Sequence, residues 1–69
     1  MKIKYFPDTD TALLEFTDRI AAETREISED IYVDLDETGQ LVSMTIEHAR
    51  TSAQIKELSF QEVTATSAA

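Results

Sequence analysis

The hydrophobic pattern of the chain is clearest between residues 30 and 47. Apolar and polar side chains alternate there in two runs, 31–35 and 42–46, as in strands with one buried face. Between the runs, Asp36 suits the first position of a turn, and Gly39, the chain's only glycine, suits the fourth. The pattern therefore predicts a central β-hairpin that the rest of the chain covers or extends.

Two more strands are predicted before this hairpin. Residues 2–6 alternate, and Pro7 ends the run because it has no backbone N–H and fixes φ for a turn. Residues 12–17 alternate again, so the two runs should form a hairpin. Residues 18–27 carry apolar side chains at both helical and strand spacing. They are few for a stable helix, so we interpret them as a strand.

The pattern changes after the central hairpin. Thr51 followed three residues later by Gln54 fits a capping box, which predicts a helix of about two turns that begins near Thr51. From residue 61 onward the side chains are mostly small and polar, without a period. We therefore expect one domain over residues 1–60 and a flexible tail over residues 61–69. The fold class is α+β, a small antiparallel sheet of four to five strands with a short C-terminal helix.

The predicted strands place most of their apolar side chains on one face of the sheet. Four or five strands span about 15–20 Å, whereas a two-turn helix is about 10 Å wide and cannot cover that face. Monomeric proteins rarely leave such an apolar patch exposed. Either the sheet curls on itself or a second copy covers it, and we favour a homodimer. The face comprises Ile3, Tyr5, Ala12, Leu14, Phe16, Ile31, Val33, Leu35, Val42, Met44 and Ile46.

The composition narrows the classes of partner. The 69 residues include 14 acidic and 6 basic side chains, a formal net charge of −8. This charge argues against binding to nucleic acid or to anionic membranes, and it is compatible with a basic protein partner, a bound cation or simple solubility. There is no cysteine and no apolar run long enough to span a bilayer. We expect a cytoplasmic protein without a cofactor.

Several short pieces of the chain occur in a recognisable order and spacing. They are Met1-Lys2-Ile3-Lys4-Tyr5, Pro7-Asp8-Thr9-Asp10, Ala22-Glu23-Thr24, Ile27-Ser28-Glu29-Asp30-Ile31, Asp34-Leu35-Asp36-Glu37-Thr38-Gly39-Gln40-Leu41-Val42, Ile46-Glu47 and Ala49. This arrangement resembles the small bacterial family called YuzE-like, a domain of unknown function (DUF2283). The resemblance covers about residues 1–50 and implies a compact antiparallel sheet, a short C-terminal helix and a strand at residues 20–27. It implies no reaction, but some relatives are encoded beside small toxin-like proteins, which suggests an antitoxin-type role. The chain departs from the family pattern at Ser28 and His48.

The central turn contains the sharpest candidate for a metal site. Asp34, Asp36 and Thr38 followed by Gly39 have the spacing of the first half of a calcium loop. The twelfth position, however, is Thr45 instead of the bidentate glutamate. The strand pattern also points Asp34 into solvent. A hairpin turn explains these residues without a metal, so Asp34 and Asp36 remain weak candidates only.

The other candidates for chemistry are weaker. Asp8 and Asp10 are common turn residues, and nothing in the sequence brings them to the central turn. His48, the only histidine, could act as a base with Glu47 or Asp30 as its orienting carboxylate. No cysteine and no serine in a glycine-flanked turn accompanies it as a nucleophile. We therefore expect no enzymatic activity.

Tyr32 and Leu13 are predicted on the outward face of the sheet. Such side chains either form a second small cluster under the chain's own loops or contact a partner, and tyrosine is a frequent interface anchor. The hypothesis is an antitoxin-like or regulatory interaction module that uses its sheet surface and Tyr32 to bind a basic protein. The alternative is a weak cation or small-ligand binder that uses the turn at Asp34 and Asp36.

Overall fold

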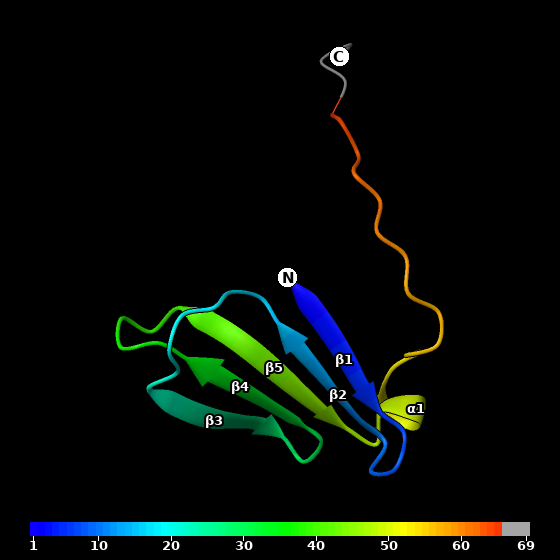
Figure 1. Cartoon of the computed structure of the whole chain (residues 1–69), viewed down its shortest axis with the longest axis horizontal. Helices are drawn as coiled ribbons and strands as arrows, with labels where there is room; N and C mark the ends of the chain where they lie inside the picture. Colours follow the sequence, from blue (N-terminus) through cyan, green and yellow to red (C-terminus); the bar gives the residue numbers. More distant parts are fainter. Residues whose placement is uncertain (66–69) are drawn as a thin grey trace.

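The computed structural model, which describes residues 1–65, places five strands in one antiparallel sheet with the order β1-β2-β5-β4-β3 (Figure 1). A single short helix, α1, follows the last strand. This arrangement confirms the predicted α+β class. The elements are β1 (Lys2–Phe6), β2 (Thr11–Glu15), β3 (Glu23–Ser28), β4 (Ile31–Leu35), β5 (Leu41–Glu47) and α1 (Ala49–Ser52).

The predicted central hairpin is the β4–β5 pair. The Gly39 N–H donates to the Asp36 carbonyl over 2.9 Å, and the Asp36 N–H donates to the Gln40 carbonyl over 2.8 Å. Gly39 has a φ of 87°, a conformation that costs glycine least. The register shifts next to the turn, where Leu35 pairs with Leu41, so this end of the hairpin contains a β-bulge.

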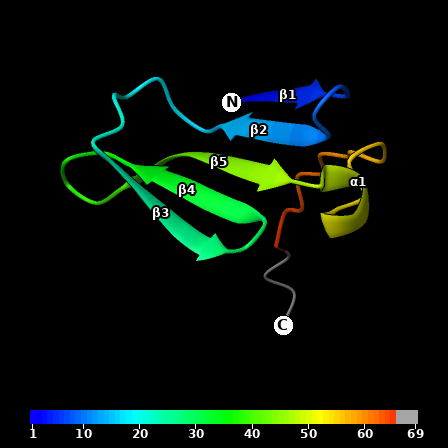
Figure 2. The ribbon, with the colours of Figure 1, turned by 90° about the horizontal axis from the view of Figure 1, so that it is seen from below.

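The ambiguous segment 18–27 contains a strand, as we preferred, but the strand begins only at Glu23. The residues before it cross from the end of β2 to the edge of the sheet beside β4, where the Ala22 N–H donates to the Leu35 carbonyl over 2.8 Å (Figure 2). Ile20 lies on this connection and is 87% exposed. The apolar residues around Ile20 therefore form no helix, although their spacing is helical.

The position and length predicted for the helix are wrong. α1 is one turn that begins at Ala49, and it stops because Ala53 has an extended backbone with φ −152° and ψ 158°. The capping box of Thr51 and Gln54 does not start a helix. Instead, the Ala49 N–H donates to the carbonyl of Asp10 in the β1–β2 turn over 2.9 Å. A contact with a distant turn therefore decides where the helix begins.

Residues 53–65 leave α1 without regular secondary structure (Figure 1). This stretch includes the part of the predicted tail that spans 61–65. The rest of that prediction, 66–69, lies outside the described residues.

The alternation along the strands gives the sheet two different faces. No large side chain in the described part of the chain is fully buried, so the sheet has only a thin core. The buried apolar residues are Ala12, Val33, Val42 and Ala49. The apolar face comprises Ile3, Tyr5, Ala12, Leu14, Ile31, Val33, Leu35, Val42, Met44 and Ile46. The polar face comprises Lys2, Lys4, Leu13, Glu15, Thr24, Glu26, Tyr32, Asp34, Ser43 and Thr45.

Candidate functional site

The two residues predicted to contact a partner lie on the same rung of the polar face. Leu13 of β2 pairs with Thr45 of β5, which pairs in turn with Tyr32 of β4. Lys4 of β1 and Glu26 of β3 complete this rung at the two edges of the sheet. Leu13 and Tyr32 are both half-buried. The register therefore brings a leucine and a tyrosine, which lie 19 positions apart in the sequence, to either side of one threonine.

Acidic side chains surround Tyr32. The carboxylate of Glu26, followed by that of Glu47, raises the pKa of the Tyr32 hydroxyl above its ordinary value of 10.0. Partial burial, Asp30 and Glu29 act in the same direction. Negative charge near a phenol disfavours the phenolate, which is the physical cause of this shift. The half of the polar face around Tyr32 therefore attracts positive charge.

The opposite edge of the polar face is electrostatically balanced. Lys4 Nζ lies 3.0 Å from Glu15 Oε1, and the two side chains are 53% and 35% exposed. An exposed pair of this kind stabilises the fold little, but it offsets the negative charge locally. The negative potential of this face is therefore concentrated on the β4 and β3 side.

Asp34 is not simply solvated, as the sequence pattern suggested, but is held by two hydroxyl groups. The Ser43 hydroxyl donates to Asp34 Oδ2 over 2.6 Å, and the Thr24 hydroxyl donates to Oδ1 over 2.5 Å. These bonds, that of Ser43 first, lower the pKa of the Asp34 carboxyl below its ordinary value. Asp34 therefore ties β3, β4 and β5 together from the polar face.

Asp36 uses its carboxylate to build the turn. Oδ1 accepts hydrogen bonds from the Thr38 N–H (2.9 Å), the Thr38 hydroxyl (2.6 Å) and the Gln40 N–H (2.9 Å). Oδ2 lies 2.9 Å from Arg19 Nε, and the side chain is only 10% exposed. These donors, Thr38 first, lower the pKa of Asp36. The weak metal candidates Asp34 and Asp36 thus bond to different protein donors, and residues 1–65 contain no cluster of three His, Asp or Glu side chains placed to hold a metal ion.

Asp10 has a structural role that the sequence reasoning missed. Its Oδ1 accepts hydrogen bonds from the Tyr5 hydroxyl (2.7 Å) and from the Arg50 N–H (3.1 Å) at the start of α1. These donors, Tyr5 first, lower the pKa of Asp10. The residue has a φ of 54°, a left-handed conformation that aspartate tolerates better than most residues. Asp10 therefore accepts a hydrogen bond from the first turn of a helix that lies 40 positions away, and no local pattern could have indicated this contact.

His48 lies beside Asp30, one of the two partners that the sequence suggested. Its Nδ1 is 2.8 Å from Asp30 Oδ1, and the imidazole is 71% exposed. The hydroxyl of Ser52 donates to Asp30 Oδ2 over 3.3 Å and to the Glu47 carbonyl over 3.1 Å. The serine hydroxyl is therefore directed at the carboxylate and the backbone, whereas a nucleophile activated by the histidine would donate to the imidazole.

The Asp30–His48 pair should make the stability of the fold depend on pH. Asp30, through its hydrogen bond and its charge, raises the pKa of His48 above 6.5. The protonated pair therefore stabilises the fold below the unfolded-state pKa, and this contribution disappears as the pH rises through the higher folded-state pKa. An NMR titration of the single imidazole should give a midpoint above 6.5.

In that titration, Asp30→Asn should return the midpoint towards the ordinary value, whereas Glu29→Gln, a matched change at the neighbouring acid, should move it much less. An unchanged midpoint in Asp30→Asn would show that the pair does not form in solution.

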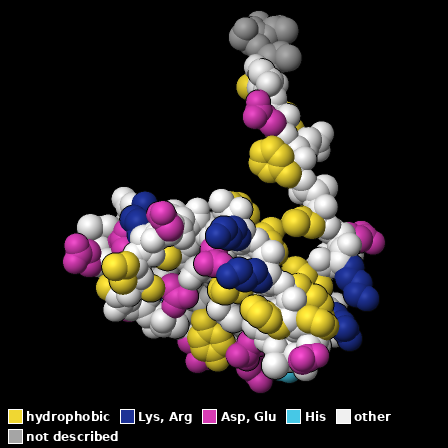
Figure 3. Space-filling model, viewed as in Figure 1, with side chains coloured by type: hydrophobic (Ala, Val, Ile, Leu, Met, Phe, Trp, Pro, Cys, Tyr) yellow, Lys and Arg dark blue, Asp and Glu magenta, His cyan; other side chains and the backbone are white. Residues whose placement is uncertain are grey.

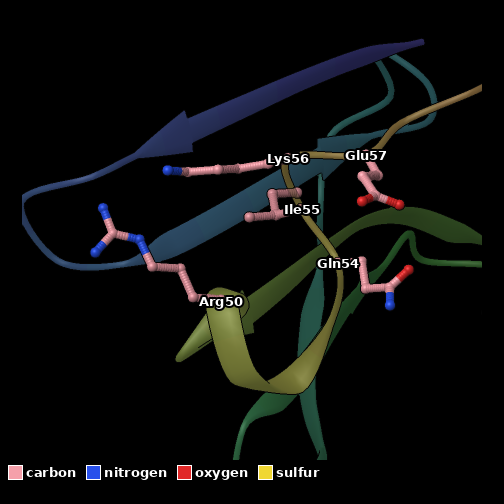
Figure 4. A pocket seen from close by; sticks show the side chains of 5 residues that line it. All are labelled: Arg50, Gln54, Ile55, Lys56 and Glu57. Atoms are coloured by element: carbon pink, nitrogen blue, oxygen red, sulfur yellow. The ribbon is translucent and has the colours of Figure 1, made fainter.

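A shallow hollow of about 290 Å³ lies between α1 and the chain that follows it (Figure 4). Ile55 projects into this space, and its side chain is half-buried. The hollow combines two basic side chains with one acid and one amide, and nothing converges on a common point within it. Its lining residues are Arg50, Gln54, Ile55, Lys56 and Glu57.

Comparison with known proteins identifies one relationship. The model of the family described as "Protein of unknown function (DUF2283)" matches residues 2–50, which span all five strands and the beginning of α1. No curated protein and no solved structure matches the chain. Within the described residues, no helix is long and apolar enough to cross a membrane. The chain belongs to the DUF2283 family.

Proposed function

We propose that this chain is a protein-interaction module of the cytoplasm, antitoxin-like or regulatory, that binds a basic segment of another protein on its polar face. One observation carries the proposal. Tyr32 is half-buried among four acidic residues and shares a rung of the sheet with Leu13. A basic, partly apolar segment has the complementary chemistry.

Each part of this surface has a physical role in the proposed complex. A lysine or arginine of the partner lies over the Tyr32 ring, where the cation–π attraction adds to the attraction of Glu26 and Glu47. Leu13 packs against the aliphatic stem of a neighbouring basic side chain. The net charge of −8 accelerates the encounter with a basic partner and makes it dependent on salt. Figure 3 shows acidic side chains spread over one view of the sheet, with fewer basic ones among them.

The bonding of the other acidic residues supports a binding role over catalysis. Asp10, Asp34 and Asp36 each accept at least two hydrogen bonds from the chain itself. They therefore hold the fold together. Of the four acids around Tyr32, Asp30 pairs with His48, whereas Glu26, Glu29 and Glu47 form no salt bridge within the described residues. The negative charge left for a partner is thus on the Tyr32 side of the polar face.

The experiment uses a short, fluorescently labelled peptide rich in arginine, titrated at low salt and followed by anisotropy. Tyr32→Ala should weaken binding about tenfold, the loss typical of a central aromatic contact. Glu26→Gln should weaken it more than Glu37→Gln, a matched charge change in the exposed β4–β5 turn. Equal losses for these two glutamine variants would show that net charge alone drives binding. Unchanged binding by Tyr32→Ala would overturn the site.

The antitoxin-like role makes a separate genetic prediction. A reading frame of similar length and strongly basic composition should lie next to the gene for this chain. Its expression alone should reduce viability, and co-expression of this chain should restore it. Restoration by Tyr32→Ala as complete as by the wild-type chain would contradict a role for this surface.

A further inference from the structure

The apolar face of the sheet is only partly covered. Its larger side chains, such as Leu14 and Met44 at the centre, are only half-buried, and no large side chain of residues 1–65 is fully buried. α1 is one turn and lies at one end of the face, where Arg50 is close enough to influence the pKa of Tyr5. The fold itself therefore leaves part of this face accessible.

The chain after α1 exposes apolar side chains of its own. Leu58, Phe60 and Val63 are 68%, 91% and 78% exposed on a segment that runs away from the sheet (Figures 1 and 3). Beyond Ala53, the described residues make one backbone hydrogen bond, from the Glu57 N–H to the Gln54 carbonyl. The segment thus has apolar side chains that do not pack on the sheet, and its backbone does not pair with a strand.

The sequence of this segment favours a continued extended path over a return to its own sheet. After the turn at residues 54–57, residues 58–65 contain no Gly, Pro, Asn or Asp, the residues that most favour a chain reversal. Ile55 is half-buried in the hollow beside α1 and fixes the position from which the segment leaves. Leu58 and Phe60, two positions apart, project from the same side of an extended chain.

The apolar face alone is too small for a stable interface, and the segment after α1 can enlarge it. Five strands about 4.8 Å apart, each of about five residues, give a flat area of about 300 Å². A stable interface buries about 800 Å² on each partner. A buried aromatic side chain alone adds about 150–250 Å². Face-to-face contact is therefore too small by itself, and the Leu58 and Phe60 side chains, which share one side of the extended segment, bring it towards the required size.

We propose that the apolar face binds a second copy of this chain, and that residues 58–63 of each copy lie across the apolar face of the other. The exchange is reciprocal, as the two-fold symmetry of most homodimers requires. Charge favours this face as well. The two charged side chains that β3 places on it, Glu23 and Arg25, pair with each other at 2.8 Å. Two copies that each carry a net charge of −8 therefore approach through their least negative surface.

This proposal does not depend on the polar face, and it has its own test. Light scattering during size exclusion should give the full chain twice its mass of 7.8 kDa. The double variant Leu58→Ser/Phe60→Ser should raise the dimer dissociation constant by about tenfold or more. Gln61→Ser, on the opposite side of the extended segment, should leave it unchanged. All these positions lie outside the strands and α1, so circular dichroism should confirm that each variant keeps its sheet.

A second measurement separates exchange between copies from folding back within one copy. In a dimer that mixes 13C-labelled and unlabelled chains, filtered NOEs should join the Phe60 ring of one copy to the Met44 methyl of the other. A monomeric full chain, an unchanged dissociation constant in the double variant, or NOEs confined to one chain would each overturn the exchange.

Discussion

Replacing Asp10 with alanine should lower the melting temperature by several degrees and detach α1 from the sheet. The substitution removes the acceptor for the Tyr5 hydroxyl and for the Arg50 N–H. It also places alanine at a φ of 54°, where a Cβ without a hydrogen-bonding side chain is disfavoured. The Asp10 side chain is 27% exposed, so water replaces these bonds only in part. Thermal unfolding and amide exchange at Ala49 and Arg50 measure the two effects.

Asp10→Asn provides the matched control for this prediction. Asparagine accepts the same hydrogen bonds and tolerates the left-handed conformation, but it has no charge. It should lose much less stability than alanine, and it should keep Arg50 protected from exchange. If alanine and asparagine were equally destabilising, the charge of Asp10 would matter, and the contacts described for its Oδ1 would not.

Replacing Asp34 with alanine should cost about 1–3 kcal/mol of unfolding free energy, because it leaves the buried Ser43 hydroxyl without its acceptor. The Thr24 hydroxyl loses its partner as well, and the edge strand β3 loses one of its ties to β4. Urea unfolding at neutral pH measures the loss. Asp18→Ala, the same change on an exposed connection, should have little effect.

The same residue contributes to the response to acid. The hydroxyl donors lower the folded-state pKa of Asp34 below 3.8, so its stabilising contribution is present above the unfolded-state pKa and is lost as the pH falls through the folded value. Asp34→Ala should therefore differ most from the wild-type chain at neutral pH and converge on it in acid. A stability difference that stays constant on acidification would contradict this account of Asp34.

The alternation of apolar and polar residues was enough to predict most of the sheet, because a strand with one buried face fixes its own pattern. Asp36 and Gly39 likewise specify the turn by local chemistry. The helix could not be predicted in the same way. Thr51 and Gln54 have the local pattern of a capping box, but the contact that starts α1 comes from Asp10, 40 positions from Arg50.

The candidate site could likewise be predicted only in part. Period two places Leu13 and Tyr32 on the outward face, but only the register of β2 with β5 and of β5 with β4 places them on one rung. The same limit applies to Asp34. Its hydroxyl partners come from two other strands, and their positions follow from strand pairing that the sequence does not encode locally.

The strand order also bears on how the chain folds. β1 with β2 forms one local hairpin, and β3, β4 and β5 form one local meander, so each unit closes only short loops. The β2–β5 seam is different, because it pairs Leu14 with Met44, 30 positions away. This pairing joins the residues that lie farthest apart in the sequence. Its entropic cost is therefore the largest in the sheet, and the chain bears it before any contact across the seam offsets it. Association of the two units along this seam should therefore limit the folding rate, so substitutions there slow folding, whereas those at the outer edges of β1 and β3 mainly accelerate unfolding.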